Sequence, residues 1–196
     1  MAEYSKARLR AITKIENAYW DLFIKEEKLT VTKVIKKANV HKSTFYFYFD
    51  SLDDVLSSIK ENQINLLEQT LNNKNRKERE FNKLTIDLKN LFNNNRKFLI
   101  PLVMEQRGGD FAIEYREIIK REFAKDIGLE YKTGNQVKDD ISNAFLNGMI
   151  EILLSTFASE IIPLEDMYKI GFGIMEKGAR KTLKENLFIK LADRFQ

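Results

Sequence analysis

Residues 40–52 read Val-His-Lys-Ser-Thr-Phe-Tyr-Phe-Tyr-Phe-Asp-Ser-Leu, with five aromatic residues in an unbroken run. Such a run fits either a buried strand or a helix with one apolar face. On a helix over residues 42–49, Phe45 and Phe49 stand four positions apart and therefore share one side. That side suits packing into a core, while the other aromatic residues of the run point elsewhere. The segments on either side of the run decide between strand and helix.

The residues before this run have helical spacing. A long helix is predicted from Ser5 to Glu27, because one face of it carries Ile12, Ile15, Tyr19, Leu22 and Phe23. A short helix follows, for which Thr30 or Thr32 can act as the N-cap. It ends near Asn39, a residue that tolerates the left-handed backbone found at helix C-termini. Only residues 39–41 separate it from the aromatic run, so the order of elements is a helix-turn-helix pattern.

A helix-turn-helix motif places the first turn of its second helix against base edges in the major groove of DNA. Lys42, Ser43 and Thr44 occupy that turn here. Lys42 has the chemistry to donate to guanine O6 and N7, and the Thr44 methyl group suits contact with a thymine methyl group. The hydroxyl groups of Tyr46 and Tyr48 suit phosphates, which fix the register of a protein on DNA. This surface is therefore predicted to bind nucleic acid.

The charge distribution favours the same partner. The net charge of the 196 residues is +4. Residues 1–49 hold ten Lys/Arg and five Asp/Glu, whereas residues 50–196 hold 23 and 24. The whole positive excess lies in the first quarter of the chain, which indicates a polyanionic partner there. A basic face that only meets water is the alternative.

The residue inventory argues against an enzyme. There is no cysteine, which excludes disulfides, thiolate zinc sites and a cysteine nucleophile. The single histidine, His41, has no second histidine to share a metal and is better explained as a polar residue at a helix start. The chain also lacks a phosphate-binding loop, a Gly-x-Ser-x-Gly elbow and a His-Glu-x-x-His motif. No cofactor and no metal are predicted.

The remainder of the chain is predicted to be helical as well. Ser51-Leu52-Asp53-Asp54 is a capping-box-like start for a helix that runs to Leu71, before a polar joint over residues 72–80. Further helices are predicted over residues 81–94, 96–106, 110–126, 136–160 and 164–186. No hairpin turn separates alternating apolar runs. The expected fold is all-α, with a three-helix helix-turn-helix domain over residues 1–52 and a helical ligand-binding and dimerisation domain over residues 53–196.

The location is expected to be cytoplasmic, without a membrane partner. The first residues are charged and no apolar segment of a signal peptide follows them. The most apolar short runs, Phe98–Met104 and Met149–Leu154, are too short to span a bilayer.

The segment Thr30–Leu56 resembles the N-terminal domain of TetR/AcrR-type transcriptional regulators. The family pattern runs Thr-Val-x-x-Ile-Ala-x-x-Ala-Gly-Val-Ser, then x-x-Thr-Phe-Tyr-x-Tyr/His-Phe, then x-Ser-Lys-x-x-Leu. Its most specific part corresponds here to Ser43-Thr44-Phe45-Tyr46, to Tyr48-Phe49 and to Ser51. The resemblance covers about residues 8–60.

The resemblance implies a ligand-responsive repressor that binds a palindromic operator in double-stranded DNA as a homodimer. The last two long helices would form the dimer interface, and the middle helices would enclose a pocket for a small-molecule inducer. Control by a protein partner instead of a small molecule is the alternative, and a helical adaptor that never meets DNA is a weaker one. The predicted DNA-binding residues are Thr30, Thr32, Lys42, Ser43, Thr44, Tyr46, Phe47 and Tyr48.

Three positions depart from the family pattern. Asn39 replaces a glycine, which is a mild change because asparagine also adopts the left-handed conformation. His41 replaces a serine that caps the recognition helix, so a weaker cap is expected. Leu52 replaces a lysine that contacts the DNA backbone, which should remove roughly one phosphate contact from the salt dependence. Basic residues near the N-terminus are expected to compensate: Lys6, Arg8 and Arg10.

The C-terminal part carries weaker signals. Gly148 lies inside one late helix and three further glycines (Gly171, Gly173 and Gly178) inside the other, which favours close helix approach at a subunit interface over a kink. The apolar stripe expected on the first of these helices is Ile141, Phe145, Met149, Ile152 and Leu153. Asp87, Glu105 or Asp110 could meet a cationic ligand, although a solvated carboxylate is favoured. The pocket residues stay open, because pocket walls and packed cores share a composition.

Overall fold

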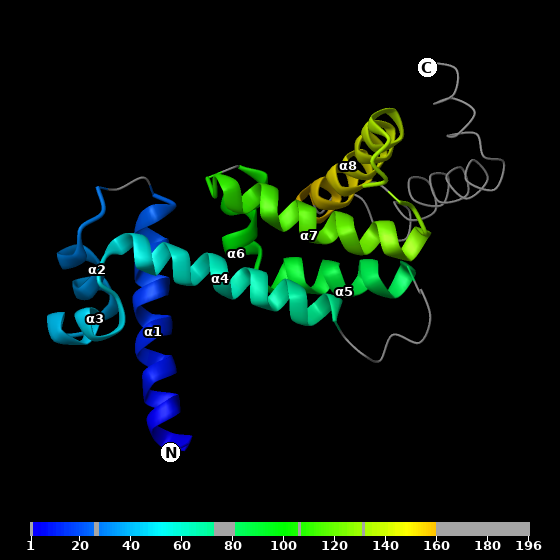
Figure 1. Cartoon of the computed structure of the whole chain (residues 1–196). Helices are drawn as coiled ribbons and strands as arrows, with labels where there is room; N and C mark the ends of the chain where they lie inside the picture. Colours follow the sequence, from blue (N-terminus) through cyan, green and yellow to red (C-terminus); the bar gives the residue numbers. More distant parts are fainter. Residues whose placement is uncertain (1, 26–27, 73–80, 106, 131, 160–196) are drawn as a thin grey trace. The chain divides into compact units, whose positions relative to one another are not determined.

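The computed structural model describes residues 2–25, 28–72, 81–105, 107–130 and 132–159. Every regular element among them is a helix (Figure 1). The elements are α1 (Ala2–Phe23), α2 (Val31–Ala38), α3 (Lys42–Tyr48), α4 (Leu52–Leu71), α5 (Phe81–Asn94), α6 (Arg96–Leu99), the π-helix η1 (Ile100–Met104), α7 (Asp110–Ile127) and α8 (Gln136–Ser159). The prediction of an all-α fold is confirmed for this part of the chain. The helix predicted over residues 164–186 lies outside the described residues.

The chain divides into two compact units, Met1–Leu66 and Leu67–Gln196. The division falls within α4, whereas the sequence suggested a boundary after residue 52, at the first residue of this helix. No break in the backbone marks the division, because α4 is continuous from Leu52 to Leu71.

In the N-terminal unit, α1, α2 and α3 contact one another in pairs. The apolar stripe predicted on α1 is confirmed at Ile15, Tyr19 and Leu22, which are buried. The other buried apolar residues of this unit are Ala18, Trp20, Val34, Ala38, Phe45, Phe49, Val55 and Ile59. Each large side chain among them stabilises the fold by roughly 1.5–3 kcal/mol relative to exposure.

Helix α1 differs from its predicted bounds, since it spans Ala2–Phe23 instead of Ser5–Glu27. The last hydrogen bond of this run joins the backbone N–H of Ile24 to the carbonyl oxygen of Trp20, at 3.0 Å. Ile24, the next residue, is exposed, so it does not hold a further turn against the core.

Helix α4 begins with the reciprocal cap that the sequence indicated. The Ser51 hydroxyl oxygen accepts from the backbone N–H of Asp54 at 3.2 Å. The Asp54 carboxylate accepts in return from the backbone N–H groups of Ser51 and Asp50, at 2.9 and 3.0 Å. These bonds satisfy donors that a helix start otherwise leaves open, and the negative charge suits the positive end of the helix.

A buried carboxylate connects α1 to α4. Glu16 is only 7% exposed, and its carboxylate accepts from the Ser58 hydroxyl group at 2.8 Å. Burial raises the pKa of Glu16 above its ordinary value, and the Ser58 hydrogen bond offsets part of this rise. Because the folded state favours the protonated form, this group stabilises the fold at acid pH and loses that contribution as pH rises through its folded pKa.

Glu16→Gln is therefore expected to raise the stability of the protein at neutral pH and to remove one source of its pH dependence. Glutamine keeps an oxygen to accept from Ser58, but it carries no charge to desolvate. The urea midpoints of wild type and variant should nearly coincide near pH 4 and separate, with the variant higher, towards pH 7. If wild type and variant had equal urea midpoints at both pH values, burial would not destabilise the charged form of Glu16.

In the C-terminal unit, the predicted helix over residues 96–106 is wrong in its second half. Helix α6 ends at Leu99 and the wider η1 turn follows. Pro101 has no N–H to donate, so the α-helical ladder cannot continue through it. Instead, the backbone N–H of Glu105 donates to the carbonyl oxygen of Ile100, five residues back, at 3.0 Å. Such a widened turn is the usual form of a π-bulge.

The turn after η1 requires a glycine. The backbone N–H of Gly108 donates to the carbonyl oxygen of Leu102 at 3.2 Å. A Cβ atom at this position would lie 2.6 Å from that oxygen, which is closer than a side chain tolerates. Any larger residue at Gly108 would force the end of η1 apart, so the break predicted at this point has a steric cause.

Helix α8 contacts α7, η1 and α5. The burial of the predicted stripe on α8 is confirmed only in part: Met149 and Leu153 are buried, but Ile141 and Phe145 are only half-buried and Ile152 is exposed. The buried side chains are Ser142, Leu146, Met149, Ile150, Leu153, Leu154, Thr156 and Phe157. This helix is apolar around most of its circumference, so the position of its neighbours decides which face is covered.

Among the described residues, α8 alone is long and apolar enough to cross a membrane by length and composition. The same length and composition occur in core helices of soluble proteins. Its eight buried side chains show that α8 serves as a core helix of the C-terminal unit.

Candidate nucleic-acid interface

Helix α2 is capped at both ends, by a side chain at its start and by backbone hydrogen bonds at its end. Thr30 is the N-cap, and its hydroxyl oxygen accepts from the backbone N–H of Lys33 at 3.3 Å. Asn39 ends the helix with φ 52° and ψ 53°, the left-handed conformation predicted for it. The backbone N–H of Val40 then donates to the carbonyl oxygen of Ile35 at 3.1 Å. This pairing resembles a Schellman motif and turns the chain sharply towards α3.

Helix α3 begins without help from the side chain before it. His41 is its N-cap residue, and it makes no side-chain cap hydrogen bond. The first bonds of the helix run from the backbone N–H groups of Thr44 and Phe45 to the carbonyl oxygen of His41, at 3.0 and 3.2 Å. The weaker cap expected from the exchange of serine for histidine is therefore present in the structure.

The aromatic run splits between core and surface, which settles that it forms a helix and not a strand. Phe45 and Phe49 are buried, with their ring centroids 6.0 Å apart. Tyr46 and Phe47 point the other way and are 46% and 74% exposed. Tyr48 is half-buried and its ring meets that of Phe47 edge-on. The helix thus has one apolar inner face and one aromatic, polar outer face.

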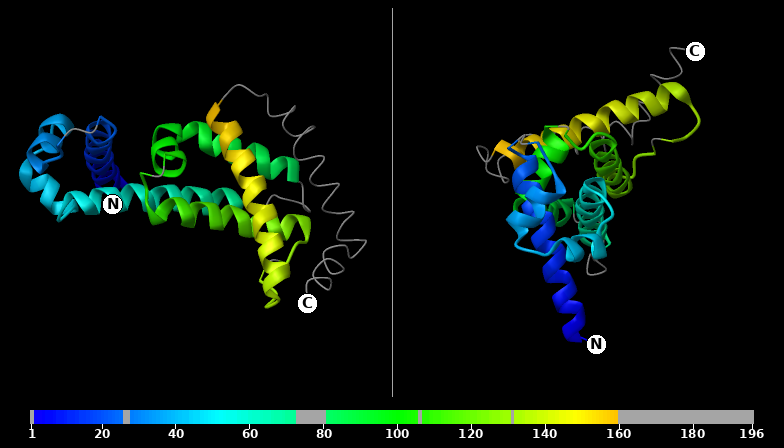
Figure 2. Two further views of the ribbon diagram at one scale, coloured as in Figure 1. Left: turned by 90° about the horizontal axis from the view of Figure 1, so that it is seen from above. Right: turned by 90° about the vertical axis from the view of Figure 1, so that its left-hand side faces the viewer.

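We call the exposed side of α3 the recognition face, formed by Lys42, Ser43, Tyr46 and Phe47. Helix α3, in light blue in Figure 2, lies next to α2 and α1 within the N-terminal unit. The Lys42 ammonium group lies 5.8 Å from the centroid of the Tyr46 ring, within the range of a cation–π contact. This face combines one cation, two hydroxyl groups and one apolar ring within two helical turns.

The remaining predicted DNA-binding residues lie beside the recognition face in different settings. Thr44 is half-buried, so its side chain divides between core and surface. Thr32 is exposed in the first turn of α2, one residue after the start of the helix. Thr30 is half-buried and its hydroxyl oxygen already serves the cap, which leaves the hydroxyl hydrogen as a donor.

The basic residues near this surface are not equivalent. Lys37 pairs with Asp21 of α1 at 3.2 Å, so its charge helps to join α2 to α1. Lys36 is exposed without such a pair. Lys6, Arg8 and Arg10 are also exposed, on the first turns of α1. An excess of positive charge therefore reaches solvent along this unit, as a polyanion partner requires.

The start of α4 holds Leu52 in place of a basic residue, and this side chain is half-buried. The next residue, Asp53, influences α1: burial first, and the Asp53 charge second, raise the pKa of Tyr19 to about 12. Tyr19 therefore stays protonated at every physiological pH.

In the C-terminal unit, the three carboxylates considered for a ligand have separate settings. Asp87 is half-buried on α5, and one of its oxygens is fully buried without a hydrogen-bond partner. Glu105 pairs with Arg107 at 3.1 Å, and Asp110 is exposed at the start of α7. Only Asp87 combines burial with an unused acceptor, which sequence periodicity alone did not indicate.

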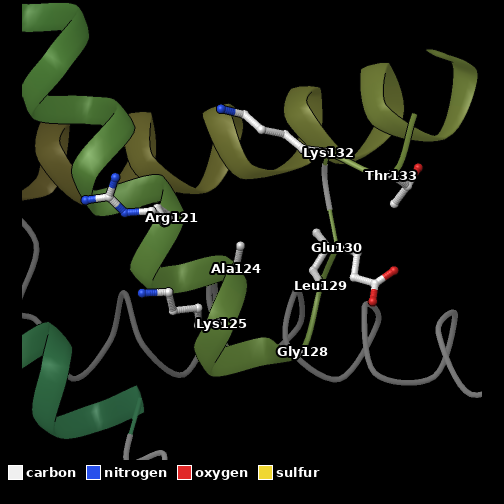
Figure 3. Close-up of a pocket in the computed structure, with 8 residues that line it drawn as sticks. All are labelled: Arg121, Ala124, Lys125, Gly128, Leu129, Glu130, Lys132 and Thr133. Atoms are coloured by element: carbon white, nitrogen blue, oxygen red, sulfur yellow. The ribbon is translucent and has the colours of Figure 1, made fainter. Parts of the chain in front are cut away.

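A pocket of about 630 Å³ lies at the C-terminal end of α7 (Figure 3). Arg121 and Lys125 border it from α7, and Lys132 borders it from the segment that follows. The Lys125 ammonium group pairs with Glu122 at 2.6 Å, so part of this positive charge is already neutralised. The sequence analysis missed this pocket, since it treated residues 128–135 only as a loop.

No group of three His, Asp or Glu residues within the described parts of the chain could hold a metal ion. Gly148 lies on an open face of α8, where an added Cβ would meet no described atom within 4 Å. The other three glycines of the predicted interface, at positions 171, 173 and 178, lie outside the described residues.

The chain matches no protein-family model, and a search of curated proteins gives no significant match.

Proposed function

We propose that this protein is a sequence-specific DNA-binding transcriptional regulator of the TetR/AcrR type, which acts as a ligand-responsive dimeric repressor. The observation that supports this proposal most directly is the recognition face of α3. Its outward side chains are a cation, hydroxyl groups and an aromatic ring, while Phe45 and Phe49 anchor the helix from behind. A short helix held in this way after a tight turn can enter the major groove.

The chemistry of the face suits duplex DNA. Lys42 supplies donors for guanine O6 and N7, and Ser43 can donate to or accept from either base pair. Tyr46, Tyr48 and Thr30 have hydroxyl groups for phosphates, and the exposed basic residues of α1 add charge for the backbone. Base contacts and phosphate contacts would thus come from neighbouring elements of one unit.

A homodimer through α8 and the helix predicted over residues 164–186 completes the proposal. On α8, Gly148 and Ile152 stand four residues apart and are both exposed. A glycine next to an apolar residue on an outer helix face permits close approach of another helix. Two α3 helices related by a two-fold axis would recognise half-sites about 34–36 Å apart, so the operator should be an inverted repeat.

A small-molecule inducer would bind in the C-terminal unit. The unpaired oxygen of Asp87 supports a ligand with a cationic or hydrogen-bond-donating group, since a buried acceptor without a partner is unfavourable. A screen by thermal shift tests this part, because a ligand at about 100 times its dissociation constant should stabilise the protein by about 2.7 kcal/mol.

The experiment that tests DNA recognition is selection from a random duplex library with the purified full-length protein, at two salt concentrations. Enrichment of an inverted repeat would support a dimeric, sequence-specific regulator. Binding that is sensitive to salt but blind to sequence would contradict the proposal and leave only a general polyanion surface.

Lys42→Ala is expected to weaken binding to the selected operator by about 1–2 kcal/mol, roughly tenfold, and to relax preference at one base pair per half-site. The reason is that Lys42 is exposed in the first turn of α3, where a base edge can reach it. Fluorescence anisotropy with the operator and with single-base variants measures both effects.

Lys89→Ala is the matched control, because it removes the same charge from α5 in the C-terminal unit. It should leave operator affinity within about twofold of wild type. If Lys42→Ala lowered affinity equally for all sequences and reduced the salt slope by about one, Lys42 would contact phosphate instead of a base.

A further inference from the structure

Phe47 has an exposure that the fold does not require. It is 74% exposed, more than any other large apolar side chain in the described parts of the chain. Its neighbours Phe45 and Phe49 fill the core, so Phe47 contributes little to the packing of the unit. Its ring is therefore available to contact a partner at the outer side of α3.

The ring is also held in a defined place. Its centroid lies 4.9 Å from that of Tyr48, at an interplanar angle of 88°, which is a favourable edge-to-face arrangement. Phe47 and Ser43 are four residues apart on α3 and so share one side of the helix. The ring therefore shares its side of α3 with a hydroxyl group, on a unit whose first 49 residues carry an excess of positive charge.

A phenyl group has no hydrogen-bond donor or acceptor, so it cannot distinguish bases by the pattern of their polar edges. In the major groove, the apolar group that a base edge offers is the C5 methyl group of thymine. Contact with that methyl group removes apolar surface from water on both partners. The positive charge of the unit attracts the duplex to this face, where the thymine methyl group is the apolar group that the ring can contact.

We propose that Phe47 recognises the 5-methyl group of one thymine in each half-site of the operator. This inference rests on the proposed function and goes beyond it, because it names the chemical group that one side chain selects. It also implies that 5-methylcytosine, which carries a methyl group at the same ring position, is accepted better than cytosine there.

The test replaces thymines of the selected operator by deoxyuridine, which keeps base pairing and removes only the methyl group. At the position contacted by Phe47, full-length wild-type protein should lose about fourfold in affinity per half-site, or about fifteenfold when both half-sites change. Deoxyuridine at thymines that neither Phe47 nor the Thr44 methyl group contacts should have less than about twofold effect.

The variant Phe47→Ala separates this contact from other causes. Because Phe47 is exposed, the variant should keep the wild-type circular dichroism and melting temperature. It should bind the thymine operator about as weakly as wild type binds the deoxyuridine operator, and it should no longer distinguish the two. Ile113→Ala, which removes a 64% exposed apolar side chain from α7, should retain full discrimination.

A second substitution of the duplex tests the methyl group in another base pair. With 5-methylcytosine in place of cytosine at the same position, wild-type protein should bind more tightly and Phe47→Ala should not. If an operator is selected but wild type ignores the methyl group at every position, the inference about Phe47 is overturned while the regulator proposal stands. If no sequence is selected at all, the regulator proposal itself fails, and this inference with it.

Discussion

Phe45→Ala is expected to lower the free energy of unfolding of the N-terminal unit by about 3–5 kcal/mol. Phe45 has no exposed surface and packs among buried residues of α3 and its neighbours. Its ring contacts those of Phe49 and Tyr46, with centroids 6.0 and 5.3 Å away. Removal leaves a cavity that a helix of seven residues cannot close by shifting, because it is tied to α2 by a tight turn.

The loss of stability would also disturb the positions of the side chains on the recognition face, because Phe45 anchors α3 from behind. Since small domains have total stabilities of about 5–15 kcal/mol, the variant should unfold partly at room temperature. Urea denaturation followed by circular dichroism measures the stability, and operator binding should fall in parallel. Phe47→Ala is the matched control: it removes the same side chain two residues away, and it should change stability by no more than about 0.5 kcal/mol.

A stable, fully folded Phe45→Ala variant would contradict the packing described for α3. It would mean that the helix is held by its backbone turn alone. If that stable variant also lost DNA binding, Phe45 would have a direct role at the interface, contrary to the complete burial of its side chain.

Arg96→Ala is expected to destabilise the C-terminal unit by about 1.5–3 kcal/mol. The Arg96 guanidinium donates to the carbonyl oxygen of Phe157 at 2.7 Å and also to that of Ala158. Both oxygens belong to the last described turn of α8, so the guanidinium ties α6 to this helix. Hydrogen bonds from a charged donor are stronger than those between neutral groups.

The measurement is again the urea midpoint of the full-length chain, together with hydrogen exchange of amides in α8. Exchange should increase most around Phe157 and Ala158, because this turn loses its hydrogen bonds to α6. Arg121→Ala serves as the control, since it removes an exposed arginine from α7 and should alter stability by less than about 0.5 kcal/mol. If the two variants lowered the stability equally, the loss of one positive charge would be responsible, and not the loss of the two Arg96 hydrogen bonds.

The sequence by itself determined the fold class and much of the N-terminal unit. The stripe on α1, the left-handed Asn39 and the Ser51–Asp54 cap are local features with a period or a spacing that side-chain chemistry explains. The burial of Phe45 and Phe49 and the exposure of Tyr46 also followed from helical geometry. Local rules succeed here because each of these features depends on residues close together in the sequence.

Other features were decided by tertiary structure alone. The buried face of α8 depends on where α5, α7 and η1 lie, because the helix is apolar on more than one side. Four further features depend on how elements pack against one another. They are the division within α4, the buried pair of Glu16 and Ser58, the unpaired oxygen of Asp87 and the pocket at the end of α7. Periodicity reports which residues share a face of one helix, whereas burial, pKa shifts and cavities depend on what another element places against that face.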